Sequence, residues 1–440
     1  MAGKSASDSM KIDTKVSVLG PAKVSSPLTN GLFMSDDATI TVHVNQVNLA
    51  GADISGYAHD LELELAGARQ NLYFDSTKVK CAVVSCGGLC PGINDVIQSI
   101  VMTAHYHYQV SGVVGIRFGL EGFIPKYRHD IMELTPQKVV DIHQFGGTIL
   151  GSSRGPQSPS EIVDALERMN INVLFVIGGD GSMKAANLIA EEVRERNQRI
   201  AIIGIPKTID NDISFVTNSF GFDTAVGKAT EAIDCAHIEA NGAFNGIGLV
   251  KLMGRESGFI AAHATLGLKE VNFVLVPEKP FVLKGENGLL AALEERLKKR
   301  RHAVIVCAEG AGQNLLKASA EKDPSGNVIL GDICDLLCRE IKDYFAKKSM
   351  PITLKFIDPS YIIRSVPANT HDSIYCGLLG QNAVHAAMAG KTAMAVSSFM
   401  DQYVYLPFSL VIRQRRKLNI NSAYWRSVMD STGQPEIAES

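Results

Sequence analysis

From about residue 80 onward, short apolar runs alternate with longer segments of mixed polarity. The clearest apolar runs are KCAVVSC at 80–86, NVLFVIGG at 172–179 and RIAIIGIPK at 199–207. Between them apolar residues recur every three to four positions, as in SPSEIVDALERMN at 158–170, which is the spacing of a helix that buries one face. Buried strands alternating with such helices are typical of a parallel sheet covered by helices on both sides.

The second half of the chain repeats this pattern. Strands are predicted by GIGLVKLM, NFVLVPE, AVIVCAEG and ITLKFID, at 246–253, 272–278, 303–310 and 352–358. Helical spacing is found around 224–240, 256–266, 287–300 and 332–346. The pattern therefore predicts a second α/β unit. Residues 1–78 differ from both halves: they begin with a stretch rich in Ser, Lys, Asp and Gly, and we interpret them as a partly disordered N-terminal extension.

Composition and charge narrow the class of protein. The chain has 440 residues, of which 46% are apolar, and a net charge of −3, which disfavours a broad nucleic-acid interface. It has no run of about 18 apolar residues that would span a membrane, and its N-terminus lacks the apolar region of a secretory signal. The eight scattered cysteines are expected to be reduced thiols. We expect a cytoplasmic protein without a nucleic-acid or membrane partner.

Four glycine-rich turns follow predicted strands. They are CGGLCPG at 86–92, GSSRGP at 151–156, GGDGS at 178–182 and MGRESG at 253–258. Glycines at strand ends allow backbone N–H groups to approach phosphate oxygens, and ligands of open α/β sheets bind at the carboxyl ends of strands. One such turn is often no more than turn geometry. Four of them, with Arg154 and Arg255 inside two, favour a phosphate-binding site.

Two of the motifs carry acids. Asp180 within GGDGS would repel phosphate unless a divalent cation bridges them, so it is a candidate Mg²⁺ ligand; the alternative is a helix N-cap. In PKTIDND at 206–212, Asp210 and Asp212 stand beside Lys207 and Thr208. One carboxylate of this pair can take a proton from a substrate hydroxyl while the other orients it. The alternative for PKTIDND is a cluster of Asx turns.

The second half supplies groups suited to a sugar phosphate. Arg255 and Arg364 are cations for a phosphate, and Glu309 at a strand end can accept hydrogen bonds from hydroxyls. Tyr361 lies three residues before Arg364. These residues therefore predict a phosphorylated acceptor on the second unit.

The motifs as a set resemble those of the 6-phosphofructokinases over roughly residues 79–430. GGLCPGIND, GGTILGSSRG, GGDGS, PKTIDNDI, GFDTAV, MGRESGF, AEGAG and YIIRS occur in the order typical of that family. The resemblance is strongest to the ATP-dependent branch of plants, protists and some bacteria, which is related to pyrophosphate-using enzymes. It implies two Rossmann-like three-layer domains with mainly parallel sheets and an active site in the cleft between them. Residues 79–220 with 366–430 would bind ATP and Mg²⁺, and 221–365 would bind fructose 6-phosphate.

The resemblance also implies roles for individual residues. Those implied for the donor phosphates are Gly87, Arg154, Gly155, Gly179, Asp180, Gly181 and Ser182, with Asp180 as the magnesium ligand. Those implied for fructose 6-phosphate are Thr208, Ile209, Asp210, Met253, Gly254, Arg255, Glu309, Lys355, Tyr361 and Arg364. The catalytic residues would be Asp210 as the base, together with Thr208, Asp212 and Arg154. The reaction implied is phosphorylation of fructose 6-phosphate to fructose 1,6-bisphosphate in glycolysis.

Three positions bear on the variant of this chemistry. Pyrophosphate users of the family typically have aspartate where this chain has Gly181, so ATP is the expected donor. Lys207 is the residue found in pyrophosphate enzymes, although the plant-like ATP branch also has it. Gly246 stands where bacterial ATP enzymes have an arginine that reaches a neighbouring subunit; a homodimer or homotetramer is still expected. A pyrophosphate-dependent enzyme and a non-catalytic regulatory subunit remain alternatives.

Overall fold

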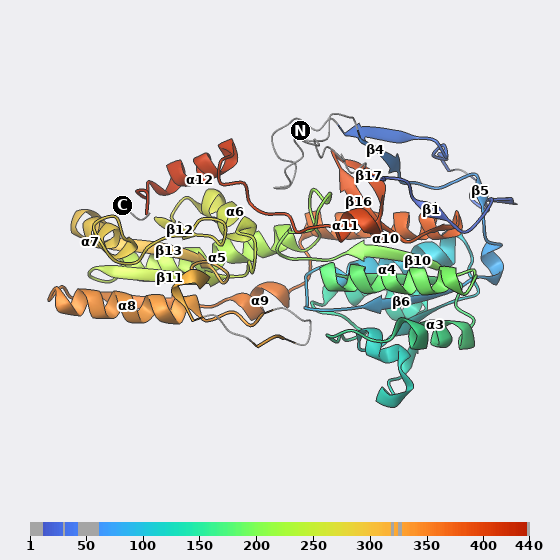
Figure 1. Cartoon of the computed structure of the whole chain (residues 1–440), viewed down its shortest axis with the longest axis horizontal. Helices are drawn as coiled ribbons and strands as arrows, with labels where there is room; N and C mark the ends of the chain where they lie inside the picture. The colour runs from blue at the N-terminus through green and yellow to red at the C-terminus, as the bar shows by residue number, and fades with distance from the viewer. Residues whose placement is uncertain (1–11, 30, 43–60, 318–320, 324–327, 438–440) are drawn as a thin grey trace, which may run out of the picture.

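The computed structural model describes residues 12–29, 31–42, 61–317, 321–323 and 328–437. We expected residues 1–78 to be partly disordered. Of these, residues 1–11, 30 and 43–60 lie outside the described residues. The described part of the chain forms two large sheets with helices packed on them, and Figure 1 shows these side by side along the long axis of the molecule. Two short strand pairs accompany them: β1 (Ser17–Val18) with β15 (Lys391–Thr392), and β2 (Val24–Ser25) with β5 (Asn71–Leu72).

The larger sheet has nine strands in the order β3-β4-β17-β16-β10-β9-β6-β7-β8. Its five central strands are parallel, and the strands at both edges are antiparallel. The bounds along the chain are β3 (Thr39–Val42), β4 (Leu61–Leu65), β6 (Lys80–Ser85), β7 (Gly112–Ile116), β8 (Ile131–Glu133), β9 (Val173–Gly178), β10 (Ala201–Pro206), β16 (Met394–Phe399) and β17 (Gln402–Pro407). The predicted extension therefore contributes β3 and β4 to this sheet.

Burial on both faces explains why the central strands are continuously apolar. Every residue of β9 and β10 is buried. Helices α3 (Pro159–Arg168) and α4 (Asp180–Glu195) pack on one face, and α1 (Ile93–Met102) and α10 (Thr370–Met388) pack on the other. The parallel register pairs Ile177 with Ile205 and Gly178 with Pro206. GGDGS and PKTIDND thus leave the sheet next to each other.

The smaller sheet is parallel throughout, in the order β12-β13-β11-β14. Its strands are β11 (Gly246–Leu252), β12 (Phe273–Leu275), β13 (His302–Ala308) and β14 (Thr353–Ile357). Helices α5 (Phe222–Asn241) and α6 (Phe259–Leu268) enclose one core with it, and α7 (Leu289–Arg300) and α8 (Ile333–Lys347) enclose the other. The expected α/β class, with mainly parallel sheets between helical layers, is confirmed.

Two segments differ from the sequence-based prediction. The sequence TPQKVVDIHQFG at 135–146 begins with a Thr cap and predicts one helix, whereas the structure has α2 (Pro136–Val139) followed by a 3-10 turn at Ile142–Gln144. Gln98 Nε2 donates to the carbonyls of Val139 and Val140 at 3.1 and 2.6 Å, so these acceptors are satisfied without a longer helix.

The second difference is in the C-terminal segment. Helix α12 (Ala423–Thr432) packs against α6, and its Trp425 is buried in the core of the four-stranded unit. The resemblance groups residues 366–430 with the first domain, whereas α12 packs on the second unit. The strands of the segment, β16 and β17, do lie in the larger sheet. No helix among the described residues is both long and apolar enough to cross a membrane.

Candidate active site

The glycine-rich turns at 86–92 and 151–156 are hydrogen-bonded to each other at the carboxyl end of β6. Gly87 has a φ of +83°, which favours glycine, and its N–H donates to the Ser153 carbonyl at 3.1 Å. The Ser152 hydroxyl donates back to the Gly87 carbonyl at 2.6 Å. Gly155, with a φ of +105°, completes the second turn. The predicted phosphate-binding residues 87 and 154–155 therefore belong to one connected surface.

Lys207 joins this surface to the next strand. It follows β10, is 5% exposed, and donates from Nζ to the Gly88 carbonyl at 2.6 Å. Burial lowers the pKa of its ammonium group. Arg154 extends over the same turn, because a Cβ built on Gly88 would lie 3.6 Å from Arg154 Nη2. Two cations thus flank the glycine turn, as a phosphate site requires.

Asp180 begins α4 directly after β9. Gly179 is the N-cap residue, so Asp180 is not the cap that was considered as an alternative. Its Oδ2 lies 2.8 Å from Lys184 Nζ and 3.8 Å from a guanidinium nitrogen of Arg415. A Cβ built on Gly181 would meet no atom within 4 Å. The space beside this carboxylate is therefore open at residue 181.

Asp210, Thr208 and Asp212 are connected in the turn after β10. The Thr208 hydroxyl donates to Asp212 Oδ1 at 2.7 Å and accepts from the Asp210 backbone N–H at 3.2 Å. Asp210 Oδ1 is buried and has no hydrogen-bond partner among the described residues. Burial first, and then the charges of Asp212 and Glu309, raise the pKa of Asp210 to about 8. A carboxyl group with such a pKa is suited to accepting a proton near neutral pH.

The turn after β11 brings the second unit to Asp210. The Ser257 hydroxyl donates to the Asp210 carbonyl at 3.1 Å, and the backbone N–H of Arg255 acts on the Asp210 carboxyl group. The Gly310 N–H donates to the Gly254 carbonyl at 3.1 Å, which places the end of β13, with Glu309, beside the MGR turn. Burial raises the pKa of Glu309, whereas nearby cations, Arg255 among them, lower it.

A short helix, α9 (Ser360–Arg364), supplies the last part of the predicted acceptor site. Its Arg364 guanidinium lies 4.7 Å from the Tyr361 ring centroid and acts electrostatically on Glu309. The side chain of Tyr361 is exposed. The structure therefore links five of the predicted acceptor residues by contacts or by charge: Thr208, Asp210, Arg255, Glu309 and Arg364. Ile209, Met253 and Gly254 are adjacent to them in the chain.

Lys355 lies apart from this group. It is an exposed residue of the edge strand β14, paired in register with Gly248 in the interior of β11. Its Nζ lies 3.4 Å from a carboxylate oxygen of Glu239 on α5. Within one chain, the described structure does not bring Lys355 to Glu309 or Arg364, because those residues lie beyond the ends of the strands.

Arg415 is a site residue that sequence reasoning missed. Its guanidinium lies 2.8 Å from Glu256 Oε1 and 3.8 Å from Asp180 Oδ2, and its charge lowers the pKa of Asp210 and Asp212. A β-bridge with Ile213 holds it there. The only signal in the sequence is the basic run RQRRK at 413–417, which adjoins no glycine turn.

Lys251 is a second residue near the site that sequence reasoning missed. A charged residue within the apolar run GIGLVKLM could have indicated that it has a buried partner. Its Nζ lies 3.0 Å from Asp332 Oδ2 and 3.6 Å from Asp358 Oδ2. Asp332 caps α8, and Asp358 accepts from the Ser360 N–H at the start of α9. Lys251 therefore connects β11, which leads into the MGR turn, to the helix that bears Arg364.

The acids of the site suit a cation that is shared with phosphate. In the part of the chain that the structure describes, no group of three or more His, Cys, Asp or Glu side chains could hold a metal ion. Asp180 is a single half-buried carboxylate beside the phosphate-binding turns. Magnesium commonly binds in this way, through one or two carboxylates and the oxygens of a phosphorylated substrate.

The chain is similar to known phosphofructokinases over most of its length. The family model described as phosphofructokinase matches residues 80–387. An ATP-dependent 6-phosphofructokinase of Borreliella burgdorferi is 49% identical over 434 residues, covering 96% of this chain and 97% of the relative. ATP-dependent 6-phosphofructokinase 1 of Arabidopsis thaliana is 49% identical, covering 84% of this chain and 79% of its own. The Trypanosoma cruzi ATP-dependent enzyme is 44% identical over 84% of this chain and 76% of its own.

Solved structures agree on the fold. A pyrophosphate-dependent phosphofructokinase from Marinobacter aquaeolei superposes with a TM-score of 0.67 at 21% identity, over 81% of this chain and 92% of that one. Pichia pastoris phosphofructokinase in the T-state superposes with a TM-score of 0.62 at 21% identity, over 81% of this chain and 37% of that one. At this identity the likeness concerns the fold and not the donor.

Proposed function

The chain belongs to the phosphofructokinase family, and from this premise we propose that it transfers the terminal phosphoryl group of ATP to the C1 hydroxyl of fructose 6-phosphate, the glycolytic reaction that yields fructose 1,6-bisphosphate. Asp210 is the observation that supports this most directly. Its Oδ1 is buried and unpartnered, and its carboxyl group interacts with Lys207 of the first unit and with the Arg255 backbone of the second. The loss of Asp180, Asp210 or Arg255 would favour a non-catalytic subunit, and all three are present.

The donor binds at the ends of β6 and β9 in this proposal. Gly155 and residues 179–181 offer backbone N–H groups, and Arg154 neutralises charge on the transferred group. Gly87 and Ser182 shape the same turns, since their own N–H groups donate to the carbonyls of Ser153 and Gly179. Asp180 would hold Mg²⁺ together with phosphate oxygens, and the ion supplies charge neutralisation on the polyphosphate when bound. Lys184 and Arg415, which contact Asp180 here, would balance its charge when no cation is bound.

The acceptor binds against the second unit. Arg255 and Arg364 hold its phosphate group, and Glu309 accepts hydrogen bonds from its hydroxyls. Asp210 takes the proton of the attacking hydroxyl. The hydrogen bond from Thr208 to Asp212 leaves that threonine oxygen able to interact with the sugar, so the second acid acts as a positioning residue. Lys355, which pairs with Glu239, is not part of this proposed site.

ATP is the proposed donor because of the open space at residue 181. A Cβ there would meet no atom within 4 Å, so the path for an α-phosphate past Asp180 is unobstructed. An aspartate would fill that space and repel the α-phosphate. Lys207 does not discriminate, because a lysine can reach a terminal phosphate in either donor.

A coupled assay with ATP and pyrophosphate side by side tests the function. We expect turnover with ATP, little with pyrophosphate, and a sharp loss of ATP use in Gly181→Asp. The Asp210→Asn variant, purified identically, controls for contaminating kinases. Preference of the wild type for pyrophosphate would overturn the donor assignment. Absence of fructose 6-phosphate phosphorylation with either donor would overturn the proposed reaction.

We further propose that the enzyme is a cytoplasmic, allosterically regulated homodimer or homotetramer. Large apolar side chains exposed at Phe145, Ile362 and Ile374 support self-association. A cross-subunit arginine at position 246 is excluded by packing, since a Cβ there would come within 2.0 Å of the Ala240 carbonyl. Light scattering of the purified protein measures the oligomer, and a monomer at micromolar concentration would contradict this proposal.

A further inference from the structure

The segment that carries Arg415 passes from the first unit to the second beside the candidate active site. It comes after β17 of the larger sheet and leads to Leu418, which is buried in a core of the four-stranded unit. Its backbone is fixed on the acidic turn after β10, because the Arg416 N–H donates to the Asp212 carbonyl at 2.7 Å. The Arg416 side chain donates to the Thr217 carbonyl at 2.7 Å. Arg415 is therefore attached to a fixed piece of backbone next to the catalytic acids.

The guanidinium group of Arg415 lies between a carboxylate of each unit. One of its nitrogens lies 2.8 Å from Glu256 Oε1, in the turn of the second unit that also holds Arg255, and another lies 3.8 Å from Asp180 Oδ2. The first contact is a hydrogen bond, whereas the second is too long to be one. The link to Asp180 is thus the weaker of the two, and a ligand can replace it while the link to Glu256 stays.

The same guanidinium group acts on the acids that would receive the proton. Burial raises the pKa of Asp210 and of Asp212, and the positive charge of Arg415 offsets part of both shifts. In the proposed reaction the phosphoryl group starts beside Asp180 and is transferred to the hydroxyl that gives its proton to Asp210. A cation that interacts with both of these carboxylates lies beside that path.

The strand order places this cation on the side of the path opposite to Arg154. Strand β9, which leads into Asp180, lies between β6 and β10. Arg154 extends over the glycine turn after β6, whereas Arg415 is bridged to Ile213 in the segment after β10. The charge of a transferred phosphoryl group is spread over three equatorial oxygens. Cations on two sides therefore neutralise more of that charge than Arg154 alone.

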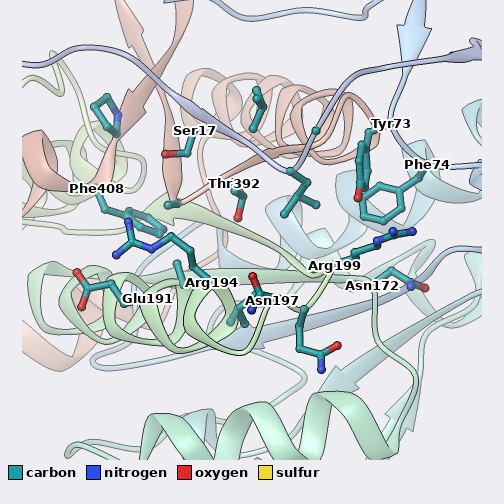
Figure 2. A pocket seen from close by; sticks show the side chains of 18 of the residues that line it. Ser17, Tyr73, Phe74, Asn172, Glu191, Arg194, Asn197, Arg199, Thr392 and Phe408 are labelled. Atoms are coloured by element: carbon teal, nitrogen blue, oxygen red, sulfur yellow. The ribbon is translucent and has the colours of Figure 1, made fainter.

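Two other arginines near α4 are out of reach of the site. Arg194 and Arg199 are exposed and line a cavity of about 1180 Å³, and Figure 2 shows their side chains directed to opposite ends of it. Asp180 is the first of the 16 residues of α4, so Arg194 in the last turn lies roughly 21 Å from it along the helix. Arg194 therefore serves as a control for the loss of a positive charge from the same unit.

We propose that Arg415 is a catalytic residue that exchanges Asp180 for the transferred phosphoryl group when the donor binds, while Glu256 keeps its guanidinium group in place. This role rests on the proposed function. In the transfer, the bond from the terminal phosphorus to the ADP oxygen breaks, the bond from the acceptor oxygen to that phosphorus forms, and the hydroxyl proton passes to Asp210. Arg415 takes no part in these covalent changes and donates hydrogen bonds to the equatorial oxygens.

The alkaline plateau of kcat separates this role from an electrostatic effect on Asp210. Loss of a charge that only lowers the pKa of Asp210 moves the acid limb of the pH–rate profile and leaves the plateau unchanged. We expect Arg415→Gln to lower the plateau of kcat by roughly 10²- to 10³-fold, with both substrates saturating, and to change KM for ATP much less. An unchanged plateau would overturn the proposal.

Matched variants test whether any lost cation has the same effect. Lys184→Gln removes another cation from the same oxygen of Asp180, at 2.8 Å. Because this ion pair is exposed, we expect at most about a fivefold loss in kcat, and no loss in Arg194→Gln. Arg415→Lys, which keeps the charge without the planar guanidinium group, should recover part of the activity. An equal loss in Lys184→Gln and Arg415→Gln would assign the effect to the charge balance of Asp180 and overturn the proposal.

Calorimetry with a stable mimic of the transfer tests the contact without turnover. Aluminium fluoride takes the place of the transferred phosphoryl group in a complex with Mg²⁺, ADP and fructose 6-phosphate, and such mimics bind through the contacts made during transfer. We expect Arg415→Gln to weaken this complex roughly tenfold or more while it binds ADP and Mg²⁺ alone like the wild type, which also shows that it is folded. If it does not bind ADP, Arg415→Lys is compared in the same way.

The outcomes distinguish this inference from the proposed function. A wild type that phosphorylates fructose 6-phosphate, with a variant that binds the mimic complex equally well, would overturn the role of Arg415 alone. A wild type that phosphorylates no fructose 6-phosphate would overturn the proposed function and this role with it.

Discussion

Replacement of Asp212 by asparagine should move the acid limb of the pH–rate profile to lower pH. In the free enzyme, Asp210 must be ionised to accept a proton, so kcat/KM for fructose 6-phosphate rises with pH through the pKa of Asp210. Burial and the neighbouring Asp212 carboxylate raise that pKa to about 8. Asp212→Asn keeps the shape of the side chain but removes the like charge, so Asp210 loses its proton more readily.

The size of the shift follows from Coulomb's law. Carboxylates two residues apart in a turn lie on the order of 6 Å apart, and an effective dielectric constant near 20 gives about 3 kcal/mol. Since one pKa unit corresponds to about 1.4 kcal/mol, the upper limit is about two units. Asp212 is itself more readily protonated than an ordinary aspartate, and Arg415 offsets part of the repulsion. We therefore expect a shift of about one unit.

The assay measures kcat/KM for fructose 6-phosphate from pH 5.5 to 9 at saturating ATP and constant ionic strength. Arg415→Gln is the opposing variant: its cation lowers the pKa of Asp210, so its removal should move the acid limb to higher pH. A lower plateau in Asp212→Asn is expected as well, because the Thr208 hydroxyl loses a charged acceptor. The assignment of the base would be refuted if neither variant displaced the acid limb.

Three further variants test other parts of the site. Asp210→Asn should lower kcat by roughly 10²- to 10⁴-fold. It should also raise Tm at pH 7.5 in calorimetry, because a carboxyl group whose pKa is raised by folding makes the protein less stable as pH rises above about 4. Near-normal turnover or a lower Tm would contradict this prediction. Arg364→Ala should raise KM for fructose 6-phosphate about ten- to a hundredfold and KM for ATP much less, and equal effects on both would place it elsewhere. Lys251→Met should raise KM for fructose 6-phosphate selectively, because it removes the ion pairs that connect β11 to the start of α9. Lys251→Arg should retain most of the affinity, and an equal loss of affinity in both variants would contradict the positioning role.

The sequence alone predicted the central strands of the nine-stranded sheet, the strands of the four-stranded sheet, and the acidic and glycine-rich motifs at their ends. Strands such as β9 and β10 are apolar on both faces because both faces are covered, so their pattern is visible without the fold. Asp180 and Asp210 could be predicted to lie near each other because each follows such a strand within a few residues, and parallel strands bring their carboxyl ends to one edge. Each motif is therefore a short continuous stretch of sequence, although the site is assembled from stretches that are far apart in the chain.

Only the tertiary structure decided which distant residues complete that site. Arg415 reaches Asp180 because a β-bridge at Ile213 brings in a C-terminal segment of no distinctive local pattern. Lys251 gains its role from Asp332 and Asp358, which are 81 and 107 positions further along the chain. Residues 17–18 likewise lie on the first unit because β1 pairs with β15, more than 370 positions further along the chain. Such long-range contacts leave no periodic pattern in the chain, because they depend on how whole elements pack and not on the spacing of neighbouring residues.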